Sequence, residues 1–511
     1  MQRRHFLKSV ALGLGTLPLA QCTVAPINLR TNPFQLGIAS GDATDDAIVL
    51  WTRLAPSPDL ADGGMPEAPV AVRWTIATDA ELQNVIRRGD VAATPEWAHS
   101  VHIDVQALAP DQTYFYQFES SGFVSQVGQT RTLPRTETAL SRARFVTASC
   151  QNYTHGLFRA YRQMVKDAPQ FVIHLGDYIY DVAYGEDFRS HETLDQPATL
   201  DAFRRRHALY KTDKDLQLAH QQLPFYAVLD NHDAIEWDDT NAYPKRAAAY
   251  QAWYEHMPVR GYAAPGANTF DMHRRIPLGD LATLHLLDPR QFRDERTPCE
   301  GPVDRSYGFG NYRERCASIF DDKRTMLGEG QERWLTDGLM ATRSPWNVLT
   351  SPGPFLPYRF LKDGEDRRYI GAWDGYPAQR QRVAAALLGN TTSHPLILSG
   401  DVHSFWAMDG GQYPLENERF GVTEFVASSI SANWPPPLAD IVTENRQNNP
   451  HLAFYGPAHR GYLLHDVTEE TWTTKARAVS DAKDPNATVD TLASFTVVNG
   501  EPGFVIAEPG G

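Results

Sequence analysis

Between residues 144 and 181, apolar runs and polar loops alternate in the order of a strand, a helix and a second strand. Phe145 to Ala148 is a short run of β-forming residues, and Phe171 to Leu175 is a second apolar run. Between the two runs, apolar residues recur at helical spacing from Leu157 to Val165, and Pro169 follows where a helix would stop. A helix that joins two parallel strands makes a right-handed crossover, so the carboxyl ends of both strands should lie on one edge of one sheet. Open α/β sheets bind their ligands at this edge.

The alternation of strands and helices continues along most of the remaining chain. The segments that we expect to form strands are 225–229, 281–287, 346–349, 395–399, 421–427, 461–479 and 493–498. The segments that we expect to form helices are 245–255, 329–341 and 378–388. This pattern predicts a layered α/β domain, a β-sandwich flanked by helices, over residues 140–511.

Residues 32–135 differ, because they carry β-type patterning alone. Runs at 47–54, 70–76 and 101–105 are separated by turn signals, and the stretch 108–116 has the pattern of a tyrosine corner. We therefore expect a small all-β domain of the immunoglobulin or fibronectin class before the α/β domain.

Polar side chains follow the first two strands of the α/β region. Cys150 comes after the first strand, and Asp177 and Tyr180 come after the second. Thiolate, carboxylate and phenolate groups together suit a ferric ion, and carboxylate and amide oxygens suit calcium or magnesium. These three residues alone could equally be a buried cysteine, a loop carboxylate and a packed tyrosine.

Three more strand ends carry polar groups of the same kinds. They are Asp230-Asn231-His232-Asp233, then Asp288 with Arg290 and Arg293, then Gly400-Asp401-Val402-His403-Ser404. Each such group would be costly to bury without a partner, whereas one shared metal centre would satisfy them together. We therefore favour a metal centre over independent structural roles.

Composition narrows the classes of function. The chain has 511 residues, of which 42% are hydrophobic, so it can form two or three domains with a sizeable core. Its net charge of −14 argues against broad nucleic-acid binding, which requires a basic face. An anionic substrate would need local positive charge, which metal ions can supply.

Residues 1–31 are expected to be a twin-arginine export signal and linker. Arg3-Arg4 precedes Phe6-Leu7-Lys8, and the apolar run that follows is shorter than the about 20 residues that a membrane span requires. We therefore expect a periplasmic or secreted protein that meets the export machinery. Cys22 lies in a sequence close to a lipoprotein cleavage box and is a candidate lipid anchor, although Gln21 departs from the usual small residue.

The chain has four cysteines. Cys299 and Cys316 bracket a loop, and in an oxidising compartment they would form a disulfide. Cys150 is then unpaired, which either metal ligation or simple burial would explain.

The motifs at these strand ends form a specific set. Gly176-Asp177, Asn231-His232-Asp233 and Gly400-Asp401-Val402-His403 resemble the ligand motifs of the calcineurin-like metallophosphatase superfamily. Cys150 in Ala-Ser-Cys-Gln-Asn, Tyr180 in Gly-Asp-Tyr-Ile-Tyr, and Asp401 in place of His are similar to the PhoD-type alkaline phosphatases and phosphodiesterases of that superfamily. The resemblance extends from about Phe34 to near the C-terminus.

The resemblance implies two metal ions and two catalytic side chains. Fe³⁺ would be held by Cys150, Asp177, Tyr180 and His403, and Ca²⁺ by Asp177, Asn231 and Asp401. His232 would contact the phosphate or protonate the leaving oxygen, and Arg290 would bind phosphate. The stretch 350–354 replaces a polar segment of the family, so the pocket wall is expected to differ, and no C-terminal helical cap is expected.

The sequence therefore predicts an exported metal-dependent phosphoesterase that hydrolyses phosphomonoesters and phosphodiesters at alkaline pH by attack of a metal-bound hydroxide. Phosphotriesters and nucleotides are alternative substrates. A cell-wall-binding lipoprotein without catalysis would be expected to have lost some of the ligand residues, which are intact here. A nuclease for long nucleic acids is disfavoured by the net charge of −14.

Overall fold

The computed structural model describes residues 27–184, 188–193, 195–234, 243–260, 271–294, 299, 312–314, 316–362, 365–411 and 421–507. The predicted export signal and Cys22 lie outside the described residues. Among the helices of the described part, none is long and apolar enough to cross a membrane.

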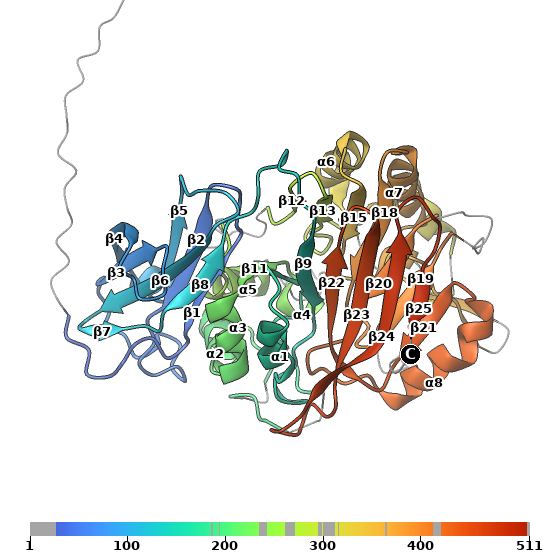
Figure 1. Ribbon diagram of the computed structural model, residues 1–511. Helices are drawn as coiled ribbons and strands as arrows, with labels where there is room; N and C mark the ends of the chain where they lie inside the picture. Colours follow the sequence, from blue (N-terminus) through green and yellow to red (C-terminus); the bar gives the residue numbers. More distant parts are fainter. Residues whose placement is uncertain are drawn as a thin grey trace, which may run out of the picture.

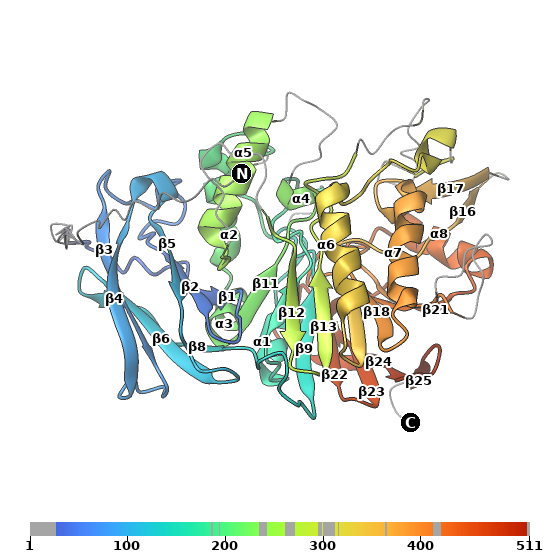
Figure 2. The ribbon, with the colours of Figure 1, turned by 90° about the horizontal axis from the view of Figure 1, so that it is seen from above.

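Two large sheets pack face to face and form the body of the molecule (Figures 1 and 2). The first has the strand order β25 (Val505–Ala507), β24 (Val489–Val498), β23 (Thr471–Val479), β22 (Arg460–Val467), β9 (Ala143–Ala148), β10 (Val172–His174), β11 (Pro224–Ala227), β1 (Ile38–Gly41), β2 (Ile48–Arg53) and β5 (Ser100–Val105). The second has the order β12 (Arg274–Leu278), β13 (Ala282–Leu286), β15 (Trp346–Thr350), β18 (His394–Ser399), β20 (Thr423–Val426), β19 (Phe405–Asp409) and β21 (Leu452–Gly456).

Alternation along the strands explains the layers. Val348 of β15 belongs to the core cluster shared with the first sheet, whereas its neighbour Leu349 belongs to a second cluster. That second cluster includes Leu335 of α6 (Gly328–Ala341) and Val383 of α7 (Pro377–Gly389). Because successive strand residues face opposite sides, the second sheet packs between the first sheet and these helices, which confirms the predicted layered α/β class.

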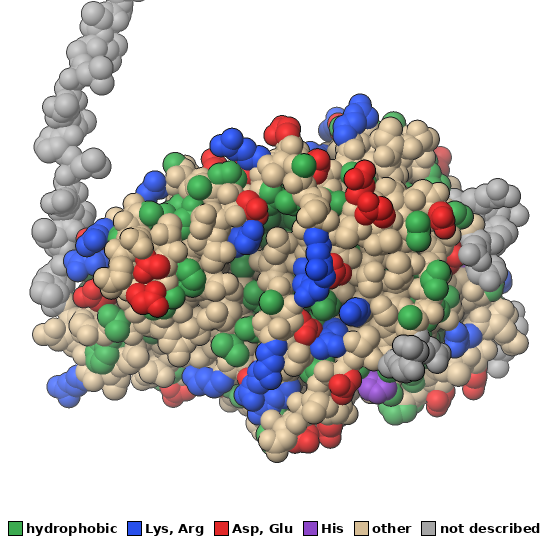
Figure 3. All heavy atoms as spheres, in the orientation of Figure 1, with side chains coloured by type: hydrophobic (Ala, Val, Ile, Leu, Met, Phe, Trp, Pro, Cys, Tyr) green, Lys and Arg blue, Asp and Glu red, His purple; other side chains and the backbone are tan. Residues whose placement is uncertain are grey.

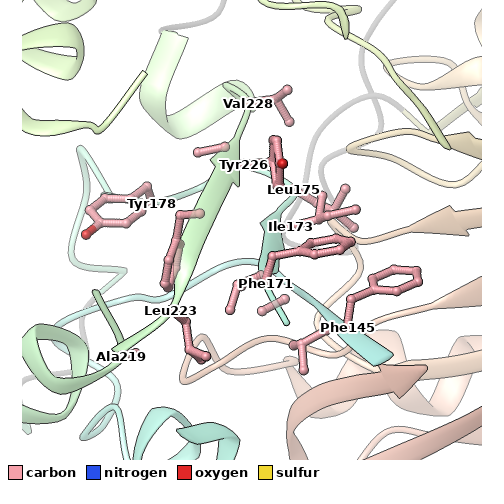
Figure 4. Packing of buried hydrophobic residues seen from close by; sticks show 14 of the residues in the cluster. Phe145, Phe171, Ile173, Leu175, Tyr178, Ala219, Leu223, Tyr226 and Val228 are labelled. Carbon is pink, nitrogen blue, oxygen red and sulfur yellow. The ribbon is translucent and has the colours of Figure 1, made fainter. Parts of the chain in front are cut away.

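The first strand–helix–strand unit forms as the sequence predicts. β9 and β10 are parallel neighbours joined by α1 (Ala160–Lys166), and β10 also pairs in parallel with β11. Phe145 and Phe171 stack with their ring centroids 5.0 Å apart. Figure 4 shows these rings with Ile173, Leu175 and Tyr226 in the apolar packing around β10 and β11. Three parallel strands therefore end together over a well-packed core.

The N-terminal unit is all-β, as expected, and it shares a sheet with the α/β part. One layer is the sheet β4 (Val85–Ala93), β3 (Val70–Ala77), β6 (Thr113–Ser120) and β7 (Phe123–Val124), with β8 (Gly128–Arg131) on β6. The tyrosine corner is present, because the Tyr114 hydroxyl accepts from the Ala109 amide at 2.8 Å. The other layer joins the ten-stranded sheet, because β1 pairs in parallel with β11.

Candidate metal centre

Sharp turns at the strand ends place the predicted ligands on one edge of the fold. Cys150, Asp177, Asp401 and His403 all adopt left-handed backbone conformations, with φ between 46° and 72°. This region costs a residue with a side chain of order 1–2 kcal/mol, and such residues cluster at functional sites. The chain holds its polar side chains here against the preference of the backbone.

Gly176 allows two of these loops to approach each other. A Cβ at this position would lie 2.4 Å from the Cβ of Asp230, and the φ of +96° also favours glycine. The loop after β10 can therefore contact the loop after β11, and any larger residue would force the two apart.

A first group of donors combines sulfur, oxygen and nitrogen. Ligand atoms of Cys150, Asp177 and His403 all lie within 4.8 Å of one another, and all three residues are buried. The Cys150 thiol lies 3.7 Å from Asp177 Oδ2. The Tyr180 hydroxyl lies 3.1 Å from Asp177 Oδ2 and 2.8 Å from His403 Nε2. All four residues that the resemblance assigns to Fe³⁺ therefore meet at one point.

The hydrogen bonding of His403 leaves one ring nitrogen available. Its Nδ1 lies 2.8 Å from the carbonyl oxygen of Asn433, so Nδ1 must carry the proton. Burial lowers the pKa of His403 to about 3, so the ring is neutral. The lone pair of Nε2 therefore faces the donor group, which is the arrangement that a metal-binding histidine requires.

A second group consists of three carboxylates. Ligand oxygens of Asp177, Asp230 and Asp401 lie within 4.8 Å of one another, so Asp177 belongs to both groups. Asp230 accepts from Arg290 Nε, and its Oδ2 is buried without a hydrogen-bond partner. Arg290 Nη2 also lies 3.4 Å from Asn231 Oδ1.

Asp233 connects the loop after β10 to the loop after β11. Its Oδ1 accepts from the Ile179 amide, and its Oδ2 accepts from the Asp230 amide, both at 3.1 Å. The Asp233 carboxylate therefore fixes the backbone of both loops, and both of its oxygens are used in these hydrogen bonds.

His232 lies beside the cluster with both ring nitrogens engaged. Its Nδ1 is 2.6 Å from Asp181 Oδ1, and its Nε2 is 2.9 Å from the Tyr184 hydroxyl. The ring stacks on Tyr180 at 4.2 Å, and the backbone amide donates to Asp177 Oδ1 at 3.0 Å. Burial would raise the pKa of Asp181, but the hydrogen bond and charge of His232 outweigh burial and lower that pKa. Asp181 is therefore ionised at neutral pH and orients the imidazole.

The electrostatics of the cluster favour a bound cation. Burial raises the pKa of Asp177 to about 6 and raises the pKa of Asp401 and of the Cys150 thiol well above their ordinary values. Charges of neighbouring carboxylates add to the effect in each case. The crowded acids, the orphaned Asp230 oxygen and the lone pair of His403 all fit a metal, which would stabilise the ionised forms.

Most of the site residues named from the sequence come together here. For two of them, Arg290 and Asn231, the expected role stays a prediction. Arg290 is buried, and its guanidinium contacts Asp230, Asn231 and the Gly371 carbonyl, while its phosphate contact stays a prediction. The sequence motif pointed to Asn231 as the ligand after β11, and that role also stays a prediction.

The sequence placed Asp230 and Asp233 among the polar groups of the expected metal centre without making either a ligand, and it gave no role to Asp181 or Tyr184. Asp230 comes directly after an apolar strand, and Asp177 and Asp401 come one glycine after theirs. The position of Asp230 at a strand end was therefore a signal that it could be a ligand. The contacts of Asp181 and Tyr184 with His232 join residues about 50 positions apart, and no local pattern marks them.

The layered sheets bring shared donors together at their strand ends, and the known proteins that this chain resembles are phosphoester hydrolases. The family model of PhoD-like phosphatase matches residues 145–476, and the model of the PhoD-like phosphatase N-terminal domain matches residues 21–134. The chain therefore belongs to the PhoD-like phosphatase family. It is 35% identical to alkaline phosphatase D of Bacillus subtilis (strain 168) over 98% of this chain and 88% of that protein. The solved structure of PhoD superposes with a TM-score of 0.86 at 34% identity, over 95% of each chain.

Proposed function

We propose that this protein is an exported, metal-dependent phosphoesterase that hydrolyses phosphomonoesters and phosphodiesters at alkaline pH. The observation that carries the proposal is the sharing of Asp177 between a mixed thiol–imidazole group and a carboxylate group. A shared carboxylate is what two adjacent metal ions require.

The donor chemistry supports a different ion in each group. Cys150, Asp177, Tyr180 and His403 would hold Fe³⁺, because three ionisable donors can offset its high charge. Asp177 and Asp401 would hold Ca²⁺ through oxygen, with Asn231 or Asp230 beside them. When bound, such ions supply charge that binds the phosphate and offsets the negative charge developing on it.

The chain's own residues supply the proton and the orientation. His232, which Asp181 orients, would donate a proton to the oxygen that leaves phosphorus, and Tyr184 contacts the nitrogen that would donate it. Arg290 is held against the carboxylate group and keeps Asp230 in place. Cys150, Asp177 and Tyr180 are buried, so water screens the electrostatic interactions among them only weakly.

The assignment of iron is tested by colour. Thiolate and phenolate ligands donate charge to ferric iron, so the purified protein should absorb visible light. Tyr180→Phe removes only the phenolic oxygen and keeps the ring, so it should shift or abolish this band. Colourless protein that is fully active and free of iron would refute the ferric assignment and leave two divalent ions as the alternative.

Two observations support export. Arg3-Arg4 precedes a short apolar run, and Cys299 and Cys316, which the sequence analysis expected to pair, form a disulfide. A disulfide is typical of an oxidising compartment. Figure 3 shows Lys and Arg side chains interspersed with Asp and Glu on one face of the molecule, which supports a small phosphoester as substrate over long nucleic acids.

The function is tested by assaying the metal-loaded enzyme against phosphomonoester, phosphodiester and phosphotriester forms of one chromogenic alcohol. Hydrolysis of the first two with slow or absent triester hydrolysis would support the proposal. Hydrolysis of the triester alone would contradict it.

A further inference from the structure

An aromatic pocket lies next to the candidate metal centre. Aromatic and apolar side chains form most of its wall, namely Leu356, Tyr358, Phe360, Tyr369, Trp406 and Trp434. They come from the segment between β15 and β16 (Phe360–Lys362), from β16 itself, from β17 (Glu365–Tyr369), from β19, and from the segment between β20 and α8 (Pro436–Asn445).

The pocket adjoins the donor groups directly. Val402 lines the pocket and stands in the chain between Asp401 and His403. The ring of Trp434 lies 6.3 Å from the ring of His403. A Cβ added at Gly353 would lie 3.6 Å from Asp401 Oδ2 and 3.8 Å from the Cβ of Ala372, another pocket residue. The Asp401 carboxylate and the Ala372 methyl group therefore both lie within van der Waals distance of the space beside Gly353.

The charge of the pocket indicates what it accepts. Asp374 is the one charged residue among the lining side chains that the structure describes. Its Oδ1 is 2.5 Å from Arg380 Nη1, and its Oδ2 accepts from the Tyr358 amide at 3.1 Å. Because this carboxylate is already paired with Arg380, the described lining offers no free counter-charge for a cation. It suits an uncharged group with a flat or compact apolar body.

The pocket wall is built before any ligand arrives. The ring of Tyr358 lies 4.8 Å from that of Phe360 and 5.0 Å from that of Trp406. The Tyr358 hydroxyl donates to the Val442 carbonyl at 2.6 Å. Rings that are fixed in this way lose little freedom on binding, so burial of an apolar ligand is not offset by ordering of the wall.

We propose that this pocket is a substrate subsite that holds the organic group of the phosphoester and selects uncharged aromatic or compact apolar groups. The inference rests on the proposed function and deepens it, because it specifies the substrate class. The phosphate would lie at the donor groups, and the organic group would extend past Gly353 and Val402 into the aromatic wall.

The test compares 2-naphthyl phosphate with phenyl phosphate, whose leaving groups have similar acidity but different apolar size. The metal-loaded wild-type enzyme should prefer the naphthyl ester by roughly 5- to 20-fold in kcat/KM, mostly through KM, as expected for burial of a second ring. Phosphocholine, which carries a cation of compact size, should gain nothing from the pocket.

Two variants change the pocket from different sides. Ala372→Leu fills part of the pocket, and Tyr369→Ala removes a half-buried aromatic ring from its wall. Each should bring the naphthyl-to-phenyl ratio close to one, while hydrolysis of glycerol 2-phosphate stays within roughly threefold of wild type, since a small polar alcohol buries little surface. Phe123→Ala, a partly buried aromatic of the N-terminal domain, is the matched control and should keep the wild-type ratio.

A measurement on the wild-type enzyme covers the case in which the variants fail to fold. Free 2-naphthol should inhibit hydrolysis competitively and bind at least fivefold more tightly than phenol. A wild-type ratio near one, a ratio that survives both variants, or a preference for phosphocholine would overturn the subsite. If the metal-loaded enzyme hydrolyses none of the esters, the proposed function itself fails, and the subsite fails with it.

Discussion

Replacing Asp181 by Asn tests how the structure prepares His232 for proton transfer. Asn has the shape of Asp, so the change removes charge and little else. Asp181 Oδ1 is 2.6 Å from His232 Nδ1, and both side chains are largely buried. A hydrogen bond to an ionised group contributes about 1.5–3 kcal/mol, against about 1 kcal/mol for a neutral one. The difference of about 1–2 kcal/mol predicts a fall in kcat of roughly 5- to 30-fold.

The same reasoning predicts a pH dependence. Because the pKa of Asp181 is lowered in the folded protein, its ionised form stabilises the fold at neutral pH. This contribution is lost as the pH falls through the range in which Asp carboxylates protonate. The difference in unfolding free energy between wild type and Asp181→Asn should therefore be largest near pH 7 and should shrink in acid.

Steady-state kinetics, elemental analysis and urea unfolding at several pH values measure these effects. His232→Ala is the matched comparison and should lower kcat by roughly 10²–10⁴ because it removes the proton donor itself. Metal content should be unchanged in both variants. An Asp181→Asn enzyme with wild-type kcat, or one that loses metal together with activity, would refute the orienting role.

Three further predictions concern other parts of the molecule. Asp401→Asn should reduce bound metal and lower kcat/KM by more than roughly 100-fold, since mutation of a residue that only hydrogen-bonds to a metal ligand already lowers metal affinity or activity by about 10–100-fold. Full metal content in this variant would show that Asp401 is not a ligand. Replacing Cys299 and Cys316 by Ser should lower the free energy of unfolding by about 2–4 kcal/mol with kcat unchanged, and an unchanged urea midpoint would show that the bridge does not stabilise the fold. Changing Arg3 and Arg4 to Lys should retain the precursor in the cytoplasm, and undiminished periplasmic activity would exclude twin-arginine export.

The strands that carry the site could be predicted because their sequences are strongly apolar and end abruptly. β9, β10 and β18 begin and end within two residues of the predicted ranges. The helices that were not predicted include α2 (Leu200–Lys211) and α3 (Lys214–Gln222). Their buried faces include Arg206, His207, Lys211 and His220, so polar side chains hide the helical spacing of apolar residues.

The donor groups were predictable where residue type and motif coincide, as at Cys150, Asp177 and His403. Contacts between distant loops were not. Pairing of β1 with β11 joins residues about 180 positions apart, and no local pattern specifies it. The partners of His232 are likewise set by how the loops after β10 and β11 meet across Gly176, which is a property of the folded chain.

The most direct test of the account is the metal content of the purified wild-type enzyme, followed through removal and return of the metals. We expect close to two metal ions per chain, iron and calcium among them, and loss of phosphomonoesterase and phosphodiesterase activity on chelation. Activity should return when both metals are restored, and Cys150→Ser should retain less iron throughout. Full activity in protein without bound metal would contradict the account.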